Sequence, residues 1–220
     1  MLEMQQTISI DTLFNSSHDR SYTKGQILLY LGEKTENVYF IRSGYVKVYD
    51  ITANGDEKLL IILGPGDIFP LIWTFEKIDA LQNFYETITE AEVSVVSRSS
   101  FIDIVEKNHT VTLYMLRYFV DRTSQLMARL ACIESSSAKH KIAQVLLYLA
   151  AAHGDEVARH AYRVRISVTH QMIADMTGLN RSTASIHMKA LETEKSFKET
   201  STGGLIIYAD RIEKFLEQET

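Results

Sequence analysis

The sequence has one cysteine, Cys132, and no uncharged apolar run of the roughly 18 residues that a membrane-spanning helix needs. A single thiol excludes an intramolecular disulfide and a thiolate metal cluster held by one chain. The first residues, MLEMQQTISID, lack the basic start and apolar stretch of a secretory signal peptide. We therefore expect a cytoplasmic protein with no membrane partner and no metal site.

Motifs for catalysis are missing as well. The sequence has no glycine-rich phosphate-binding loop, no His-x-x-x-His metal pair and no Gly-x-Ser-x-Gly nucleophile motif. We therefore predict that the chain is not an enzyme and has no catalytic residues. The formal net charge of −5 is not the strongly basic balance of many nucleic-acid binders, but the acidic excess lies in residues 1–137. Residues 138–220 carry 11 Lys and Arg against 10 Asp and Glu.

The first hundred residues combine short apolar segments with glycine turns. Asn54-Gly55 between two of these segments is typical of a tight β-hairpin, whose turn needs positive φ. Repeated short strands with such turns predict an antiparallel β-roll of the jelly-roll type over residues 1–109, although an unspecified β-sandwich would share these features. The segments rich in Val, Ile, Leu, Tyr and Phe are 26–30, 38–42, 45–50, 58–63 and 85–96.

The pattern then changes to helical spacing. Ser99 and Ser100 are expected to cap a short helix over 101–107. From about Thr110 to Glu134 there is no Gly or Pro, and apolar residues alternate steps of three and four, as in a coiled-coil seam. A single wide core stripe in a monomer would give the same periodicity. The predicted dimerisation residues are Leu113, Leu116, Val120, Thr123, Met127 and Leu130, and a second apolar face comprises Met115, Phe119, Leu126 and Ile133.

Three serines, Ser135, Ser136 and Ser137, mark the predicted end of the long helix and cap the next one. The chain therefore divides into a β-roll sensor domain (1–109), a dimerisation helix with its hinge (110–137) and a C-terminal domain (138–220). The overall fold class is α+β. The C-terminal domain is expected to begin with a helix over 138–152, a loop over 153–162 and a short strand over 163–167.

Residues 168–193 have the pattern of a helix-turn-helix. Thr169 and Asn180 are N-cap residue types, and Gly178 suits the positive φ of the sharp turn between the two helices. The apolar face of the second helix comprises Ala184, either Ile186 or Met188, and Leu191. Such a helix enters the major groove of DNA, and residues 199–208, with Gly203-Gly204 at their turn, are typical of a wing. Contacts to bases or phosphates are predicted for Asn180, Arg181, Ser182, Thr183, Ser185 and Lys189.

Nearly the whole chain resembles the CRP/FNR family of bacterial regulators. The matching residues are Gly25, Gly32, Ser43-Gly44, Gly55, Gly64-x-Gly66-Asp67, Lys141-Ile-Ala-Gln144 and the helix-turn-helix. The resemblance implies a cyclic-nucleotide-binding-type β-roll, a homodimer on a two-fold symmetric operator in double-stranded DNA, and RNA polymerase as a partner. It also implies that Thr169, His170 and Gln171 contact phosphates and that Arg181 reads a base. Ser182 and Ile186 stand where the family commonly has Glu and Arg, so a different operator sequence is expected.

The residues that hold a cyclic nucleotide in this family are absent. No Gly-Glu pair follows Gly66-Asp67, no Arg lies between Arg42 and Arg98, and Leu126-Met127 replace a hydroxyl-bearing pair on the long helix. We expect an unknown small effector other than cyclic AMP, or none, and the cofactor is unknown. A group of mostly aromatic residues either lines a pocket for an apolar effector or fills the space of a nucleotide. This group comprises Phe69, Trp73, Phe75, Tyr85, Leu126 and Met127.

A function of another class also fits the sequence. The chain would then be a ligand-binding module whose winged helix mediates protein–protein contacts, in agreement with the near-neutral charge of its C-terminal part. Salt dependence distinguishes the two functions, because a DNA binder loses affinity steeply as salt rises.

Overall fold

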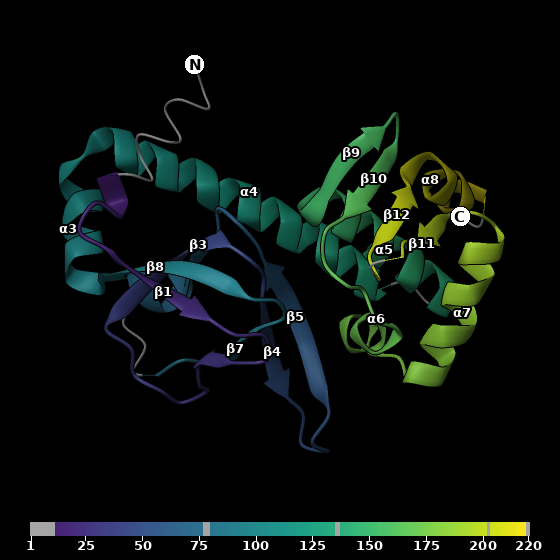
Figure 1. The fold of residues 1–220 in the computed structure, drawn as a ribbon, viewed down its shortest axis with the longest axis horizontal. Coiled ribbons are helices and arrows are strands. Elements are labelled where there is room, and N and C mark those ends of the chain that lie inside the picture. The colour runs from purple at the N-terminus through teal and green to yellow at the C-terminus, as the bar shows by residue number, and fades with distance from the viewer. Residues whose placement is uncertain (1–11, 77–79, 135–136, 202, 219–220) are drawn as a thin grey trace. The chain divides into compact units, whose positions relative to one another are not determined.

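The computed structural model describes residues 12–76, 80–134, 137–201 and 203–218, and it divides into two compact units, Met1–Asp121 and Arg122–Thr220. The boundary falls inside the long helix α4, so that this helix begins in one unit and ends in the other (Figure 1). The first unit contains β1 (His18–Tyr22), β2 (Ile27–Leu29), β3 (Asn37–Ser43), β4 (Val46–Ile51), β5 (Glu57–Leu63), β6 (Ile68–Phe69), α2 (Leu71–Phe75), β7 (Phe84–Thr87), β8 (Ala91–Ser97), α3 (Arg98–Lys107) and the start of α4 (His109–Glu134).

The strands of the first unit form two antiparallel sheets, ordered β1-β8-β3-β6 and β2-β7-β4-β5. Strand β3 shows how they are layered, because alternate residues of a strand point to opposite faces of a sheet. Tyr39 and Ile41 pack in a core shared with the second sheet. Val38 and Phe40 pack in a separate core with residues of α3 and α4. The β3 sheet is therefore the middle layer, with strands on one side and helices on the other. The antiparallel pairing agrees with the β-roll that the sequence predicts.

Helix α4 is fastened to the β-roll through a buried hydrogen-bond network. The Tyr118 hydroxyl accepts from the backbone N–H of Ile68 at 3.0 Å and donates to Asp67 Oδ1, also at 3.0 Å. The second carboxylate oxygen of Asp67 accepts from the N–H of Gly64 at 2.7 Å. Asp67 is only 2% exposed, so these bonds compensate for removing a polar group from water. The network ties the helix to the turn between β5 and β6.

The second unit is a small helical domain with one antiparallel sheet, ordered β11-β12-β10-β9. Its first helix, α5, is apolar on most of its surface and packs against α6, α7 and α8. No helix in the described part of the chain is both long enough and apolar enough to cross a membrane. The elements are α5 (Ala138–His153), β9 (Gly154–Ala158), β10 (Ala161–Val164), α6 (His170–Thr177), α7 (Arg181–Thr193), β11 (Phe197–Glu199), β12 (Leu205–Tyr208) and α8 (Ala209–Gln218).

Several sequence predictions for the first unit need correction. The sequence did not predict β1, β6 or α2. The strand predicted over 85–96 is two strands, β7 and β8, which pair with different sheets. Helix α3 begins at Arg98 and is capped by Ser97, whose hydroxyl accepts from the N–H of Ser100, so the caps predicted at Ser99 and Ser100 were wrong. The predicted Asn54-Gly55 hairpin is confirmed, with Gly55 at φ +87° between β4 and β5.

Three predictions for the second unit were also wrong. The segment predicted as a loop over 153–162 contains β9 and the start of β10, and the strand predicted over 163–167 ends at Val164. Ser137 occupies the N-cap position of α5 but its side chain makes no capping hydrogen bond. Ser135 and Ser136 lie outside the described residues. The long helix and α5 themselves are confirmed at 109–134 and 138–153.

Candidate nucleic-acid interface

Helices α6 and α7 have the caps and the turn that the sequence predicts. The Thr169 hydroxyl accepts from the N–H of Met172 at 3.1 Å and so begins α6. Gly178 ends that helix in the left-handed region, at φ 69°, where a side chain would be strained. Asn180 begins α7, because its Oδ1 accepts from the N–H of Thr183 at 2.8 Å. These local signals fix the sharp turn between the two helices.

Helix α7 has one buried face and one exposed face. Ala184, Met188 and Leu191 are at most 1% exposed and pack inside the unit. Ile186 is 67% exposed, so Met188 rather than Ile186 completes the apolar face that the sequence left open. The outward face presents Arg181, Ser182, Ile186 and Lys189.

Residues at the start of both helices are connected by hydrogen bonds. The Ser185 hydroxyl donates to the carbonyl oxygen of Arg181 at 2.8 Å and lies 3.0 Å from His170 Nδ1. The Ser185 hydroxyl proton goes to the Arg181 carbonyl, so the Ser185 oxygen accepts a hydrogen bond from the Nδ1–H of His170. Ser185 is thus engaged within the motif, and this contact leaves Nε2 as the open nitrogen of the His170 ring. Gln171 donates to Asp175 at 2.7 Å and is otherwise exposed.

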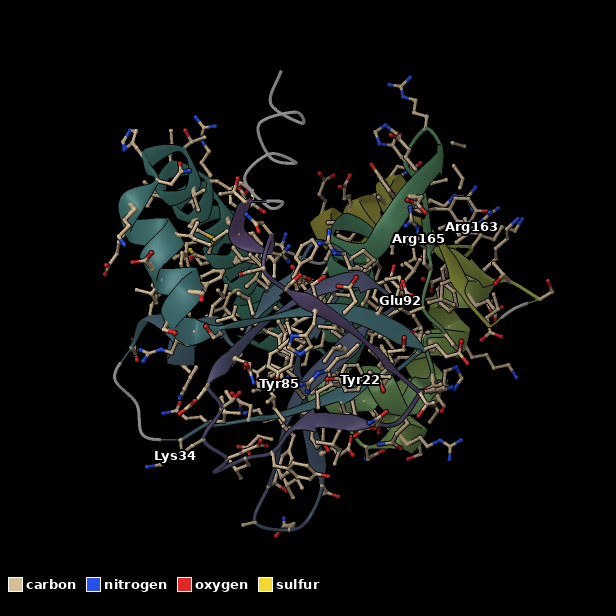
Figure 2. The ribbon with its side chains drawn as sticks, turned by 60° about the vertical axis from the view of Figure 1, so that its left-hand side comes forward. Tyr22, Lys34, Tyr85, Glu92, Arg163 and Arg165 are labelled. Carbon is tan, nitrogen blue, oxygen red and sulfur yellow. The ribbon has the colours of Figure 1, made fainter. Side chains whose placement is uncertain are left out.

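Exposed arginines lie on and beside the sheet of the second unit as well as at the start of α7. Figure 2 shows Arg163 on β10 and Arg165 just after it, both exposed. Arg165 forms a paired contact with the carboxylate of Asp155, which holds the pKa of that carboxyl below its usual value. The charge of Arg165 is therefore partly balanced. Strands β11 and β12 form the predicted wing hairpin, with Gly203 at φ +78° in its turn.

The interior of the β-roll is filled by a stack of three aromatic rings. Phe69 of β6 stacks between Tyr39 of β3 and Tyr85 of β7, with centroid distances of 5.2 Å and interplanar angles of 14° on both sides. The stack therefore bridges the two sheets, since β3 and β6 belong to one and β7 to the other. Burial raises the pKa of Tyr85 to about 12, because an ionised phenolate would be poorly solvated in this core. Trp73 and Leu81 pack in the same core.

The structure does not bring all six predicted effector-pocket residues together. Phe69, Trp73 and Tyr85 share one core, but Phe75 lies in edge-on contact with Phe101 and Phe119. Leu126 and Met127 are exposed on α4, at 50% and 67%. Leu81 was missed by the sequence reasoning, and no local signal marked it.

Arg98 is a basic residue beside this group of aromatic residues, and its side chain is held by two contacts. Its guanidinium lies 4.9 Å from the ring centroid of Trp73, and its Nε donates to the carbonyl oxygen of Thr74 at 2.9 Å. Arg98 thus holds α2 against the start of α3. Within the residues that the structure describes, no group of three or more His, Cys, Asp or Glu side chains is placed to hold a metal ion.

Two family models match the chain. Residues 19–108 match the cyclic nucleotide-binding domain, and residues 140–212 match the Crp-like helix-turn-helix domain. The first match covers most of the β-roll, and the second covers the winged helix.

Curated relatives match over most of the chain. The cAMP-activated global transcriptional regulator CRP of Pasteurella multocida is 28% identical over 198 residues, which is 87% of this chain and 92% of that protein. The protein of the same name from Haemophilus influenzae is 25% identical over 188 residues, or 84% of this chain and 82% of that protein.

Solved structures share the fold. FixK2 from Bradyrhizobium japonicum superposes with a TM-score of 0.74 at 18% identity, covering 90% of this chain and 96% of its own. A CooA mutant from Carboxydothermus hydrogenoformans gives a TM-score of 0.72 at 20% identity, covering 93% and 89%. At these identities the likeness concerns the fold alone.

Proposed function

This chain belongs to the CRP/FNR family of transcription regulators, and on that premise we propose that it binds a two-fold symmetric site in double-stranded DNA as a homodimer. The observation that carries the proposal is the α6–Gly178–α7 geometry, with capped helices and an exposed polar face at the start of α7. Such a helix fits the major groove of B-DNA. The protein acts in the cytoplasm, and by family resemblance RNA polymerase is its protein partner.

The contacts to DNA divide into two groups. Thr169, His170 and Gln171 at the start of α6 lie where backbone N–H groups and side-chain donors meet phosphates. Arg181 is exposed at the start of α7, and a guanidinium there pairs bidentately with guanine. Lys189, two turns later, adds a phosphate contact. Ser182 donates to Asn180 Oδ1 at 2.7 Å and Ser185 is engaged with His170, so these two hydroxyls support the reading face.

The homodimer forms along α4. Large apolar residues lie exposed on one stripe of this helix, with Leu116 at 59%, Val120 at 57% and Met127 at 67%. Met115 and Tyr118, on the other face, are buried against the β-roll. Leu113, Thr123 and Leu130 continue the stripe with steps of three and four, and all three are exposed. Exposed apolar residues in this spacing are typical of a helix that pairs with a second copy.

Selection of bound sequences from random DNA tests this function. We expect a two-fold symmetric site whose half-sites lie about 34–36 Å apart, one turn of the duplex, because the two reading helices of a dimer are related by symmetry. Affinity for that site is expected to fall steeply with rising salt, through release of counterions from the phosphates. Failure to enrich any sequence at low salt would favour a winged helix that contacts protein.

A cyclic nucleotide is not the effector of this chain. The relatives named above are cAMP-activated, but the ring stack of Tyr39, Phe69 and Tyr85 occupies the β-roll interior here. A phosphodiester anion needs a cationic cradle with several hydrogen-bond donors. The Arg98 side chain is already engaged with the Thr74 carbonyl and the Trp73 ring. The sequence has no other Arg between Arg42 and Arg98. The residues present therefore do not fit the nucleotide.

Isothermal titration with cyclic AMP and cyclic GMP checks this expectation. The expected result is no saturable heat at micromolar concentration of either nucleotide, because aromatic rings occupy the interior and the Arg98 side chain is already engaged. The same preparation must bind its selected DNA site, which shows that the protein is folded and active. Micromolar binding of either nucleotide would contradict our interpretation of the interior.

A further inference from the structure

Ile186 is an isolated apolar side chain on the polar face of α7. It is 67% exposed, whereas the apolar residues that pack this helix into the unit are buried. It lies one helical turn after Ser182 and about one turn before Lys189, on the face that the proposed function places in the major groove. Packing within the unit does not account for its size at this position.

Because the neighbouring serines are engaged within the motif, Ile186 and Arg181 are the residues of α7 that we assign to base contacts. The hydroxyls of Ser182 and Ser185 are both donated within the motif, to Asn180 and to the Arg181 carbonyl. In the described part of the chain, the Arg181 guanidinium makes no hydrogen bond or ion pair. One reading residue is thus a cation with several donors, and the other has no polar group.

We infer that Ile186 reads the C5-methyl group of a thymine, an inference that rests on the proposed DNA-binding function. The thymine methyl is the one apolar group that standard bases present in the major groove. An isoleucine against any other base edge covers donors or acceptors without pairing them, which costs affinity. Against a thymine methyl, the same side chain buries apolar surface on both partners.

The geometry also limits where that thymine lies. Arg181 and Ile186 are five residues apart, or about 7.5 Å along the axis of a helix that rises 1.5 Å per residue. This distance is roughly two base-pair steps of 3.4 Å. The half-site should therefore contain a guanine read by Arg181 and, within about two base pairs of it, a thymine read by Ile186.

Substitution of deoxyuridine for thymidine tests the inference on the selected site, since uracil differs from thymine only by the missing methyl. One thymine position is replaced at a time, and the same position is replaced in both half-sites. Binding of the full-length protein to each modified site is then measured. We expect one thymine at which the change weakens binding by about 3- to 10-fold per half-site, the equivalent of burying about one methyl group. Ile186→Ala is expected to bind the thymine and uracil sites equally.

Lys189→Ala is the matched control, because Lys189 is exposed on the same face but is assigned to a phosphate. It is expected to weaken all sites evenly and to keep the penalty for uracil. Because Ile186 is exposed, Ile186→Ala should melt at the parental temperature, and Ile186→Val should retain part of the discrimination. A site that tolerates every uracil, or an equal penalty in Ile186→Ala, would overturn the inference alone. Failure to select any site would instead overturn the proposed function and the inference with it.

Discussion

Phe69→Ala is expected to destabilise the first unit by about 3–5 kcal/mol, the range for removing a buried phenyl ring from a packed core. Phe69 is 2% exposed and stacks between Tyr39 and Tyr85. Its loss removes ring contacts on both faces and leaves a void, because the two sheets hold the backbones of its neighbours apart. Urea denaturation measures the change, and the fluorescence of the single tryptophan, Trp73 in the same core, reports unfolding.

Phe75→Ala is the matched control for this prediction. It removes the same side chain one short helix away, but Phe75 is 39% exposed and does not belong to the stack. We expect it to cost about 1–2 kcal/mol, since less apolar surface returns to water. An equal decrease in the free energy of unfolding in the two variants would show that the ring stack adds no stability beyond that of any phenyl ring in this region.

Leu116→Glu combined with Val120→Glu is expected to convert the dimer into a monomer. Both residues lie on the exposed apolar stripe of α4, where paired helices would bury like charges against each other. A monomer reads one half-site at a time, so affinity for the complete site should fall by about 10²- to 10⁴-fold, the gain that linked binding provides. Analytical ultracentrifugation measures the first effect, and titration of labelled DNA measures the second.

Asp121→Lys provides a control on the same helix. Asp121 is exposed but lies off the stripe, one position after Val120, so reversing its charge should leave the dimer intact. If the double glutamate variant stays dimeric and binds its site with parental affinity, the stripe is not the interface. If Asp121→Lys also loses the dimer, the effect of the double variant would reflect general disruption of α4 by charge changes and not loss of the apolar stripe.

The helix-turn-helix was predictable from the sequence because its signals are local. Thr169, Gly178 and Asn180 act within three or four residues of themselves, and their residue types are those that caps and turns require. The direction of Ile186 was not predictable in the same way. Spacing places both Ile186 and Met188 near the edge of the apolar face, and only the packing of the unit buries Met188.

Strands without an apolar pattern were missed for a physical reason. Strand β1, with sequence HDRSY, is mostly exposed and is held by its pairing with β8, about 70 residues later in the sequence. Strand β9, with sequence GDEVA, is a similar case that pairs at the edge of its sheet with β10. Edge strands of this kind gain their stability from backbone hydrogen bonds to a partner, so their own side chains give little signal.

The effector-pocket residues were only partly predictable. A run of aromatic residues after Gly66-Asp67 indicates apolar surroundings, but it does not say which rings share a core. Phe75 falls in a five-residue helix whose turns place neighbouring side chains on different faces, and it points toward Phe101 and Phe119 instead. Leu81 follows that helix in the sequence and packs in the same core as Phe69 and Trp73, and no apolar periodicity in the sequence points to it.

The ring stack that joins the two sheets also sets the conditions under which any small molecule could act on this regulator. A ligand that enters between the sheets binds only molecules in which the rings have already separated. Its apparent dissociation constant is then the intrinsic constant divided by the population of that open state. If opening costs even half of what we expect for the loss of Phe69, about 2 kcal/mol, the open population is only a few per cent. Opening at this cost would weaken the apparent affinity of an effector by about 30-fold, and a ligand that replaces the aromatic contacts it displaces would recover part of that loss.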